Sequence, residues 1–190
     1  MDLVPFASVD RTALRWLRTA ESPAGFSLLS GDATVASLAW NARGGSLATA
    51  ATADGAWTFK RAGFLAPTIT VRLRDQPQPL AKVTAHLRSH EIRLREGPSY
   101  RLQHVSHILP SWKLVSERDE EVLHIEPAAE HGSLRGGAVV VSSQSDSSET
   151  LLLIALCWYF IVLAWFEDEL VEALVPFEGP DAPVRLEWPT

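Results

Sequence analysis

The stretch LLLIALCWYFIVLAWF, residues 151–166, runs for sixteen residues without a charged or amide side chain. As a helix it would rise about 24 Å, which is less than the roughly 30 Å hydrocarbon core of a membrane. Glu149 precedes it and three acids, Glu167, Asp168 and Glu169, follow it, with no lysine or arginine nearby to interact with lipid head groups. A membrane protein anchored by residues 151–166 is one interpretation, but both length and flanks count against it.

Two other interpretations place this stretch inside a protein core. A buried strand is one of them, but sixteen residues would span two or three ordinary strands, and no turn residue interrupts the run. The other is a helix that is apolar on every side, which a protein keeps only by surrounding it with the rest of the chain. We expect this buried helix, which requires the rest of the chain to form a closed structure around it.

The rest of the chain is typical of such an enclosing β-structure, because short strand-like runs alternate with turn residues. The expected strands are Arg11–Arg18, Gly25–Leu29, Thr34–Trp40, Leu47–Thr52, Ala56–Arg61, Thr68–Arg74, Leu80–Leu87, Glu91–Glu96, Tyr100–Ser106, Trp112–Glu117, Val122–Glu126 and Gly137–Ser142. Residues 68–74 and 91–96 alternate apolar and polar side chains, so one face of each strand is expected to be buried. Asp54-Gly55 is the best hairpin candidate.

Closure into a barrel explains the helix better than a sandwich does. A sandwich offers no place for an apolar helix, whereas a barrel of about twelve strands has a lumen too wide for its own side chains. The predicted fold class is therefore mainly β, an antiparallel closed barrel of about twelve strands that encloses a hydrophobic C-terminal helix.

The organisation expected is one domain over residues 1–174, with the central helix at about 149–170. The serine-rich linker 142–148 would carry the chain from the barrel rim to the helix, and Ser147 or Ser148 would cap it, with Glu149 favourable near its N-terminus. Residues 175–190 contain four prolines and are typical of an extended strap or a partner-binding tail.

This order of elements, about twelve strands and then a hydrophobic helix that threads them, resembles the tubby C-terminal-like superfamily. That superfamily includes the tubby proteins, the phospholipid scramblases and the LURP-one-related proteins. The resemblance covers roughly residues 10–170 and rests on element order and the helix. It implies binding rather than catalysis, with anionic phospholipid or phosphoinositide head groups as ligands, and it transfers no individual residue.

Composition and charge bound the function further. The chain has 190 residues, 46% hydrophobic and 21% charged, and its single cysteine excludes an internal disulfide. The net charge is −6, yet residues 60–101 carry nine basic against three acidic residues, whereas residues 102–190 carry four against fifteen. This asymmetry indicates either an anion-binding face or two ends that neutralise each other across the fold. The acidic total, without an aromatic-basic recognition motif, disfavours nucleic acid as a partner.

Four arginines are the best binding candidates in the sequence: Arg72, Arg74, Arg93 and Arg95. Each pair is spaced two residues apart on an expected strand and so faces one side, where guanidinium groups can hold phosphate through paired hydrogen bonds. The alternative is a solvated strand face, because arginine outnumbers lysine 14 to 3 in this chain. Lys60 and Arg61, beside Trp57 and Phe59, form a weaker version of the same pattern.

No residue pattern points to catalysis, metal or a cofactor. Cys157 lies among apolar residues with no charge to lower its pKa. His86 and His90 have a chelating spacing, but residues 89–91 are expected in a turn and no third ligand has a motif. His104 and His107 would face opposite sides of a strand.

Asp119, Glu120 and Glu121 are expected in a hairpin turn rather than in a carboxylate pair. No motif of a serine hydrolase, a phosphate-binding loop or a dinucleotide-binding fold is present. The expected function is therefore a non-enzymatic binding or scaffolding module, and the resemblance implies anionic phospholipid or phosphoinositide head groups as its ligands. The alternatives are a protein-interaction module without a small ligand, the membrane-anchored protein, and an enzyme whose site is assembled from loops.

The N-terminal Met-Asp-Leu-Val-Pro lacks the features of a signal peptide. The expected location is cytoplasmic, with peripheral contact to a membrane.

Overall fold

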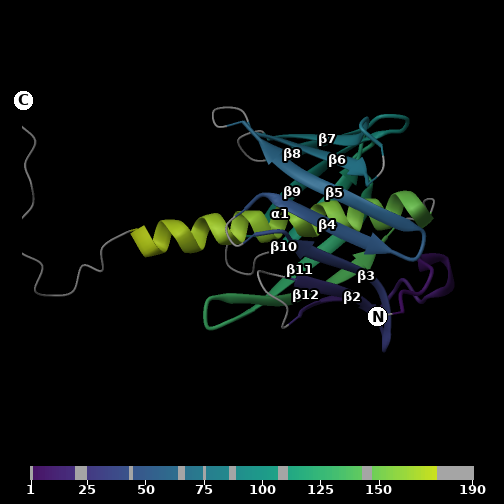
Figure 1. The fold of residues 1–190 in the computed structure, drawn as a ribbon, viewed down its shortest axis with the longest axis horizontal. Coiled ribbons are helices and arrows are strands. Elements are labelled where there is room, and N and C mark those ends of the chain that lie inside the picture. Colours follow the sequence, from purple (N-terminus) through teal and green to yellow (C-terminus); the bar gives the residue numbers. More distant parts are fainter. Residues whose placement is uncertain are drawn as a thin grey trace, which may run out of the picture.

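The chain forms a β-barrel with a helix along its axis (Figure 1). The computed structural model describes residues 2–19, 25–42, 45–63, 67–74, 76–85, 89–106, 111–142 and 147–174. Within these residues, twelve strands close into one antiparallel sheet and a single α-helix follows them. The predicted fold class is confirmed.

Hairpin connections link the strands in chain order. The strands are β1 (Leu14–Arg18), β2 (Gly25–Ser30), β3 (Ala33–Trp40), β4 (Leu47–Thr52), β5 (Gly55–Ala62), β6 (Thr68–Leu73), β7 (Pro79–Ala85), β8 (Ser89–Leu94), β9 (Ser99–Ser106), β10 (Ser111–Ser116), β11 (Glu121–Glu130) and β12 (Ser133–Val141). The barrel closes where β1 pairs with β12, with Leu14 opposite Val139. Closure leaves no strand with an unpaired edge along its whole length.

Alternation along the strands separates an inner from an outer face. On β6, Ile69 and Val71 are buried, whereas Arg72, the residue that follows Val71, is exposed. The turn between β4 and β5 contains Ala53 and Asp54, with Gly55 opposite Thr52, as the Asp-Gly pair predicts. The period-two pattern therefore assigned these faces correctly.

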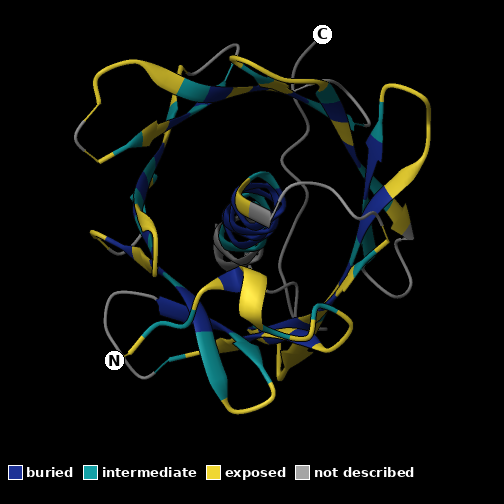
Figure 2. Cartoon of the chain, turned by 90° about the vertical axis from the view of Figure 1, so that its right-hand side faces the viewer, coloured by how far each residue is buried: buried dark blue, intermediate teal, exposed yellow. Residues whose placement is uncertain are grey.

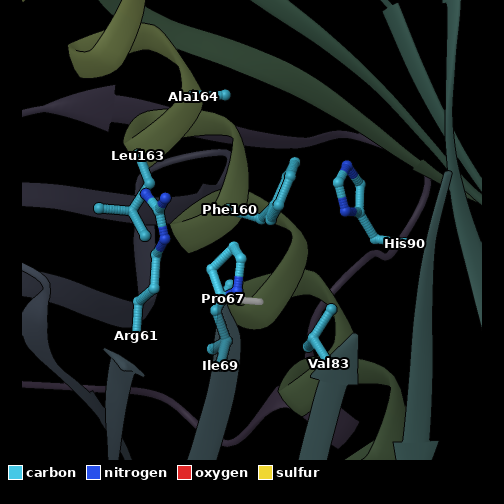
Figure 3. Close-up of a pocket in the computed structure, with 8 residues that line it drawn as sticks. All are labelled: Arg61, Pro67, Ile69, Val83, His90, Phe160, Leu163 and Ala164. Carbon is cyan, nitrogen blue, oxygen red and sulfur yellow. The ribbon is translucent and has the colours of Figure 1, made fainter. Parts of the chain in front are cut away.

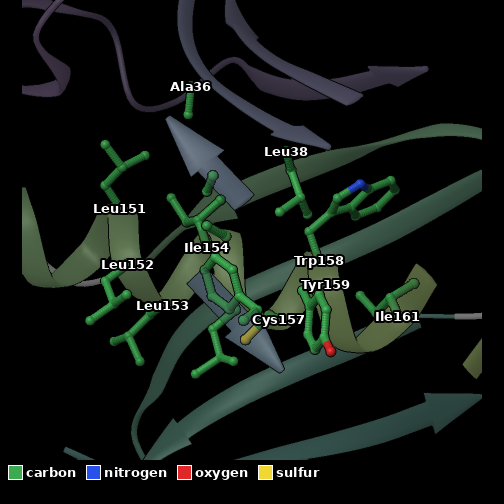
Figure 4. Close-up of a cluster of buried hydrophobic side chains, with 14 of the residues drawn as sticks. Ala36, Leu38, Leu151, Leu152, Leu153, Ile154, Cys157, Trp158, Tyr159 and Ile161 are labelled. Carbon is green, nitrogen blue, oxygen red and sulfur yellow. The ribbon is translucent and has the colours of Figure 1, made fainter. Parts of the chain in front are cut away.

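Helix α1 (Ser147–Leu174) runs through the centre of the barrel (Figure 2). Every residue from Leu151 to Leu163 is buried except Phe160, which is half-buried (Figure 4). The segment Ser148–Phe166 is long and apolar enough to cross a membrane, with a mean hydropathy of 2.0, yet 72% of it is buried inside the protein. The barrel wall supplies the apolar surroundings that this helix needs on all sides.

Aromatic side chains hold two sides of the helix. Trp158 stacks on Trp16 of β1, with ring centroids 5.7 Å apart and planes at 8°. Tyr159 stacks on Trp40 of β3 at 5.6 Å and on Phe59 of β5 at 5.3 Å. These contacts fix the rotation of α1 relative to the barrel.

Polar contacts tie both ends of the buried segment to the wall. At the entrance, the Tyr100 hydroxyl of β9 donates to the Glu149 carboxylate, and Phe6 of the 3-10 helix η1 (Phe6–Ser8) is buried beside α1. At the exit, Trp165 Nε1 donates to the Gly132 carbonyl, 2.9 Å away in the β11–β12 turn. Trp158 and Trp165, seven residues apart on α1, therefore contact neighbouring parts of the wall.

Several boundaries differ from the sequence-based expectation. The last hairpin is longer than expected, because β11 continues through Pro127 to Glu130 and β12 begins at Ser133. Within the described residues the β10–β11 pairing ends at Ile125, and Pro127 pairs with Gly137 of β12, which suits a residue without a backbone N–H. Helix α1 also begins at Ser147, so the two expected capping serines lie within its first turn.

Candidate functional site

The four predicted arginines lie on the outer surface near one end of strands β6 and β8. Arg72 lies on β6 and Arg93 on β8, and both side chains are exposed. Arg74 and Arg95 follow the ends of these strands, where their backbone N–H groups donate to Ala56 O and Leu80 O. The expectation that all four lie on strands is therefore wrong for Arg74 and Arg95.

Strand β7 separates the two arginine pairs. Because neighbouring strands lie about 4.8 Å apart, β6 and β8 are separated by about 10 Å. A register shift between Val71 and Arg72 places Arg72 opposite Pro79, at the start of β7. The four guanidinium groups therefore do not come from adjacent strands, and a side chain of β7 lies between them.

That side chain is Lys82, which is not among the residues predicted from the sequence. Lys82 lies directly opposite Arg93 on one side and Thr70 on the other. It is exposed, between the buried residues Ala81 and Val83. The alternation of residues 80–84 is the signal that would have placed Lys82 on the same face as the arginines.

We call Arg72, Arg74, Lys82, Arg93 and Arg95 the basic face. Part of it forms an open groove of about 410 Å³, lined by Gln78, Pro79, Leu80, Lys82, Arg93 and Arg95 among others. The groove is shallow and exposed, so it suits a surface or a charged head group better than an enclosed small molecule.

Ion pairs engage some of these cations. Arg93 contacts Glu91 at 2.7 Å, and Arg95 contacts Glu96 at 3.3 Å and the Gln78 side-chain oxygen at 3.0 Å. Arg72, Arg74 and Lys82 have no ion pair within the part of the chain that the structure describes. Exposed ion pairs contribute about 0–1 kcal/mol, so an incoming anion can replace those of Arg93 and Arg95 at little cost.

Lys60 and Arg61, the second basic pair predicted from the sequence, lie on opposite faces of the barrel wall. Lys60 is exposed on the outer face of β5, opposite Thr70. Arg61 is half-buried and lines a second pocket, of about 150 Å³, between the wall and α1 (Figure 3). We call this cavity the mouth pocket, and its lining includes Arg61, Ile69, Val83, His90, Phe160 and Leu163.

The histidines belong to packing contacts. His90 lies in β8, not in the turn expected for residues 89–91, and its ring centroid is 3.9 Å from that of Phe160. His104 is 4.8 Å from Trp112 by the same measure. His86 and His107 lie outside the described residues, as does the tail 175–190. Among the described residues, no three His, Cys, Asp or Glu side chains are placed to hold a metal ion.

The remaining polar candidates are structural in their geometry. Burial raises the pKa of the Cys157 thiol far above its ordinary value, which keeps it protonated. Asp119 lies in the turn between β10 and β11 with φ of 60°, and its carboxylate pairs with Arg101. The expected hairpin turn is confirmed, although Glu121 is already the first residue of β11.

Comparison of the chain with protein-family models, with curated proteins and with solved structures gave no match.

Proposed function

We propose that the protein is a non-enzymatic binding module, built on a tubby-like barrel, whose basic face docks on anionic phospholipid surfaces. The observation that carries the proposal is the placement of Lys82 directly opposite Arg93 in an open groove, with Arg72 on the next strand. On this proposal the protein is cytoplasmic and contacts the membrane peripherally.

The electrostatics of the groove favour an anionic partner. Lys82 and Arg93 lie directly opposite each other on the sheet, where like charges repel, and an anion bound between them would reduce that repulsion. A guanidinium group holds a phosphate oxygen pair through two parallel hydrogen bonds, and an ammonium group adds a compact charge. One lipid phosphate between Arg93 and Lys82 could accept hydrogen bonds from the guanidinium group and lie against the ammonium charge.

The barrel wall gives this surface a rigid base. Val83 and Ile92, the inward neighbours of Lys82 and Arg93, are 3% and 1% exposed, so both strands are anchored in the core. The backbone bond from Arg95 N–H to Leu80 O also holds the end of β8 against β7. The cations therefore project from fixed backbone positions, which lowers the entropy lost on binding.

Vesicle co-sedimentation tests the proposal. The probes are vesicles of phosphatidylcholine alone and vesicles of phosphatidylcholine mixed with phosphatidylserine, each at low and at high salt. We expect binding only to the mixed vesicles, with weakening at high salt because exposed charges are screened. Inorganic phosphate as a competitor distinguishes a membrane surface from a free anion, since a surface site with several weak contacts should be displaced only slightly.

The double variant Lys82→Gln/Arg93→Gln should bind about 30-fold more weakly, because each basic residue near an anionic surface contributes about 1 kcal/mol. The matched control is Arg15→Gln/Arg118→Gln, which removes the same charge from exposed positions on β1 and on the β10–β11 turn. Equal loss in both variants, or no loss in the first, would contradict the proposal. Sedimentation that persists at high salt and ends only in detergent would instead favour the membrane-anchored alternative.

A further inference from the structure

We propose that the mouth pocket binds a small aromatic monocarboxylate, with its ring in the cavity and its carboxylate held by Arg61. This site lies on the inner side of the wall, between β5–β8 and α1, and is separate from the basic face (Figure 3). The inference does not depend on the proposed lipid binding.

The position of Arg61 is unusual for a charged residue. Arg61 is opposite Ile69, which is opposite Val83, which in turn is opposite Ile92. The other three side chains of this inward row are buried and apolar. Arginine is rarely placed in an apolar row, because its charge loses hydration there.

A guanidinium group has the capacity for a ligand here. It carries five N–H donors in a planar fork, so it can bind a carboxylate through two of them while it keeps an existing partner through others. A single guanidinium matches the single charge of a carboxylate. Among the described lining residues, Ile69, Val83 and Leu163 are apolar and Arg61 is the one lysine or arginine, which favours a single negative charge over a dianion such as phosphate.

The size of the cavity limits the apolar part of the ligand. At about 150 Å³, the mouth pocket matches the volume at which an apolar protein cavity takes up benzene. A six-membered ring with one carboxylate therefore fits, whereas a long acyl chain does not.

The far wall of the pocket is itself aromatic. Phe160 lies between the positions of Arg61 and His90 in Figure 3, and its ring centroid is 3.9 Å from that of His90 and 5.5 Å from that of Trp112. Aromatic rings pack favourably in offset or edge-to-face arrangements, with about 0.5–1.5 kcal/mol beyond the buried area. An aromatic body is therefore favoured over an aliphatic one.

The pocket is reachable from solvent. Phe160 and Ala164 are half-exposed on the part of α1 that approaches the end of the barrel, and Arg61 is the penultimate residue of β5. A ligand can enter ring first along α1 and leave its carboxylate at the guanidinium group.

Benzoate is the test ligand, and NMR of isotopically labelled protein is the measurement. We expect saturable shifts of the methyl groups of Ile69, Val83 and Leu163. Benzyl alcohol, which has the ring but no charge, should shift the same methyl groups but bind with lower affinity. Inorganic phosphate should shift none of them. Absence of saturable benzoate shifts at these methyl groups would overturn the inference.

Variants separate the two parts of the site. Arg61→Gln should weaken benzoate binding by at least about 10-fold and leave benzyl alcohol binding unchanged. The matched control is Lys60→Gln, the adjacent residue on the outer face, which should bind benzoate as the unaltered protein does. Equal benzoate affinity in Arg61→Gln and in the unaltered protein would contradict the role of Arg61.

A second variant covers the case in which Arg61→Gln fails to fold. Ala164→Leu fills the pocket from α1 and should abolish binding of both ring compounds, whereas retained binding would contradict the location. The basic-face variant Lys82→Gln/Arg93→Gln should bind benzoate normally, which keeps this test distinct from that of the proposed function.

Discussion

The Tyr100 hydroxyl of β9 donates a hydrogen bond to the Glu149 carboxylate in the first turn of α1. Tyr100 is 7% exposed, and burial together with this bond raises the pKa of its hydroxyl well above the ordinary value. The bond joins two segments separated by 49 residues in the sequence. It is a polar contact that holds the start of the central helix against the barrel.

Replacing Tyr100 by phenylalanine should destabilise the protein by about 1.5–3 kcal/mol, because a buried donor to a charged acceptor is lost. Chemical denaturation measures this free energy of unfolding. Amide exchange should also become faster in the first turns of α1. The control is Tyr159→Phe, which removes a hydroxyl that donates to the neutral carbonyl of Ser46 and should cost about 0.5–1.5 kcal/mol. A larger loss in the control than in Tyr100→Phe would contradict the role assigned to Glu149.

Hydrogen exchange should place residues 151–163 among the most protected amides of the chain. These residues are enclosed by the barrel, so their amides exchange only when the sheet opens globally. Mass spectrometry of exchanged peptides measures this directly. Fast exchange at residues 151–163, together with slow exchange in β3 and β6, would mean that the helix leaves an intact barrel.

Gly137→Ala should destabilise the barrel by about 1–3 kcal/mol through overpacking. A methyl group at this position would lie 2.9 Å from a ring carbon of Trp158 and 2.7 Å from the Glu126 carbonyl oxygen. The thermal midpoint measures the effect, with Ala138→Ser as the control because Ala138 is exposed on the same strand. An unchanged midpoint in Gly137→Ala would mean that α1 can shift away from β12.

Alkaline pH should destabilise the protein through Cys157. Burial raises the pKa of its thiol in the folded state, so the thiol deprotonates first in the unfolded chain, at about pH 8.5. This contribution to stability is complete below that pH and is lost as pH rises toward the folded value, by up to about 1.4 kcal/mol per pH unit.

Urea denaturation between about pH 8.5 and pH 10 measures the slope. Cys157→Ala should flatten it, whereas Tyr159→Phe should change the slope only above about pH 10, where the unfolded tyrosine titrates. Burial also raises the pKa of Tyr159. A slope in Cys157→Ala equal to that of the unaltered protein would contradict this account.

Sequence pattern alone was sufficient for the fold class. In a soluble protein, a helix of sixteen consecutive apolar residues must be buried on all sides. The strands with period-two alternation were the only predicted elements that could enclose it. Boundaries were less predictable where pairing overrode a local signal. Pro127 indicates the end of a strand by its missing N–H, yet β12 pairs with it from the other side.

The candidate site was predictable only in part. Alternation placed Arg72 and Arg93 on the outer surface, since side-chain direction along a strand follows from local geometry. It did not reveal that β7 brings Lys82 between them, because neighbour relations depend on which strands pair.

The mouth pocket also depends partly on local geometry and partly on the tertiary structure. Local geometry determines that Lys60 and Arg61 face opposite sides of β5. Only the closed barrel decides which of the two faces α1, because inside and outside exist only once β1 has paired with β12. The sequence by itself determined the elements and their two-faced character. The tertiary structure decided which distant residues meet, since those contacts depend on strand register and on the rotation of the helix within the barrel.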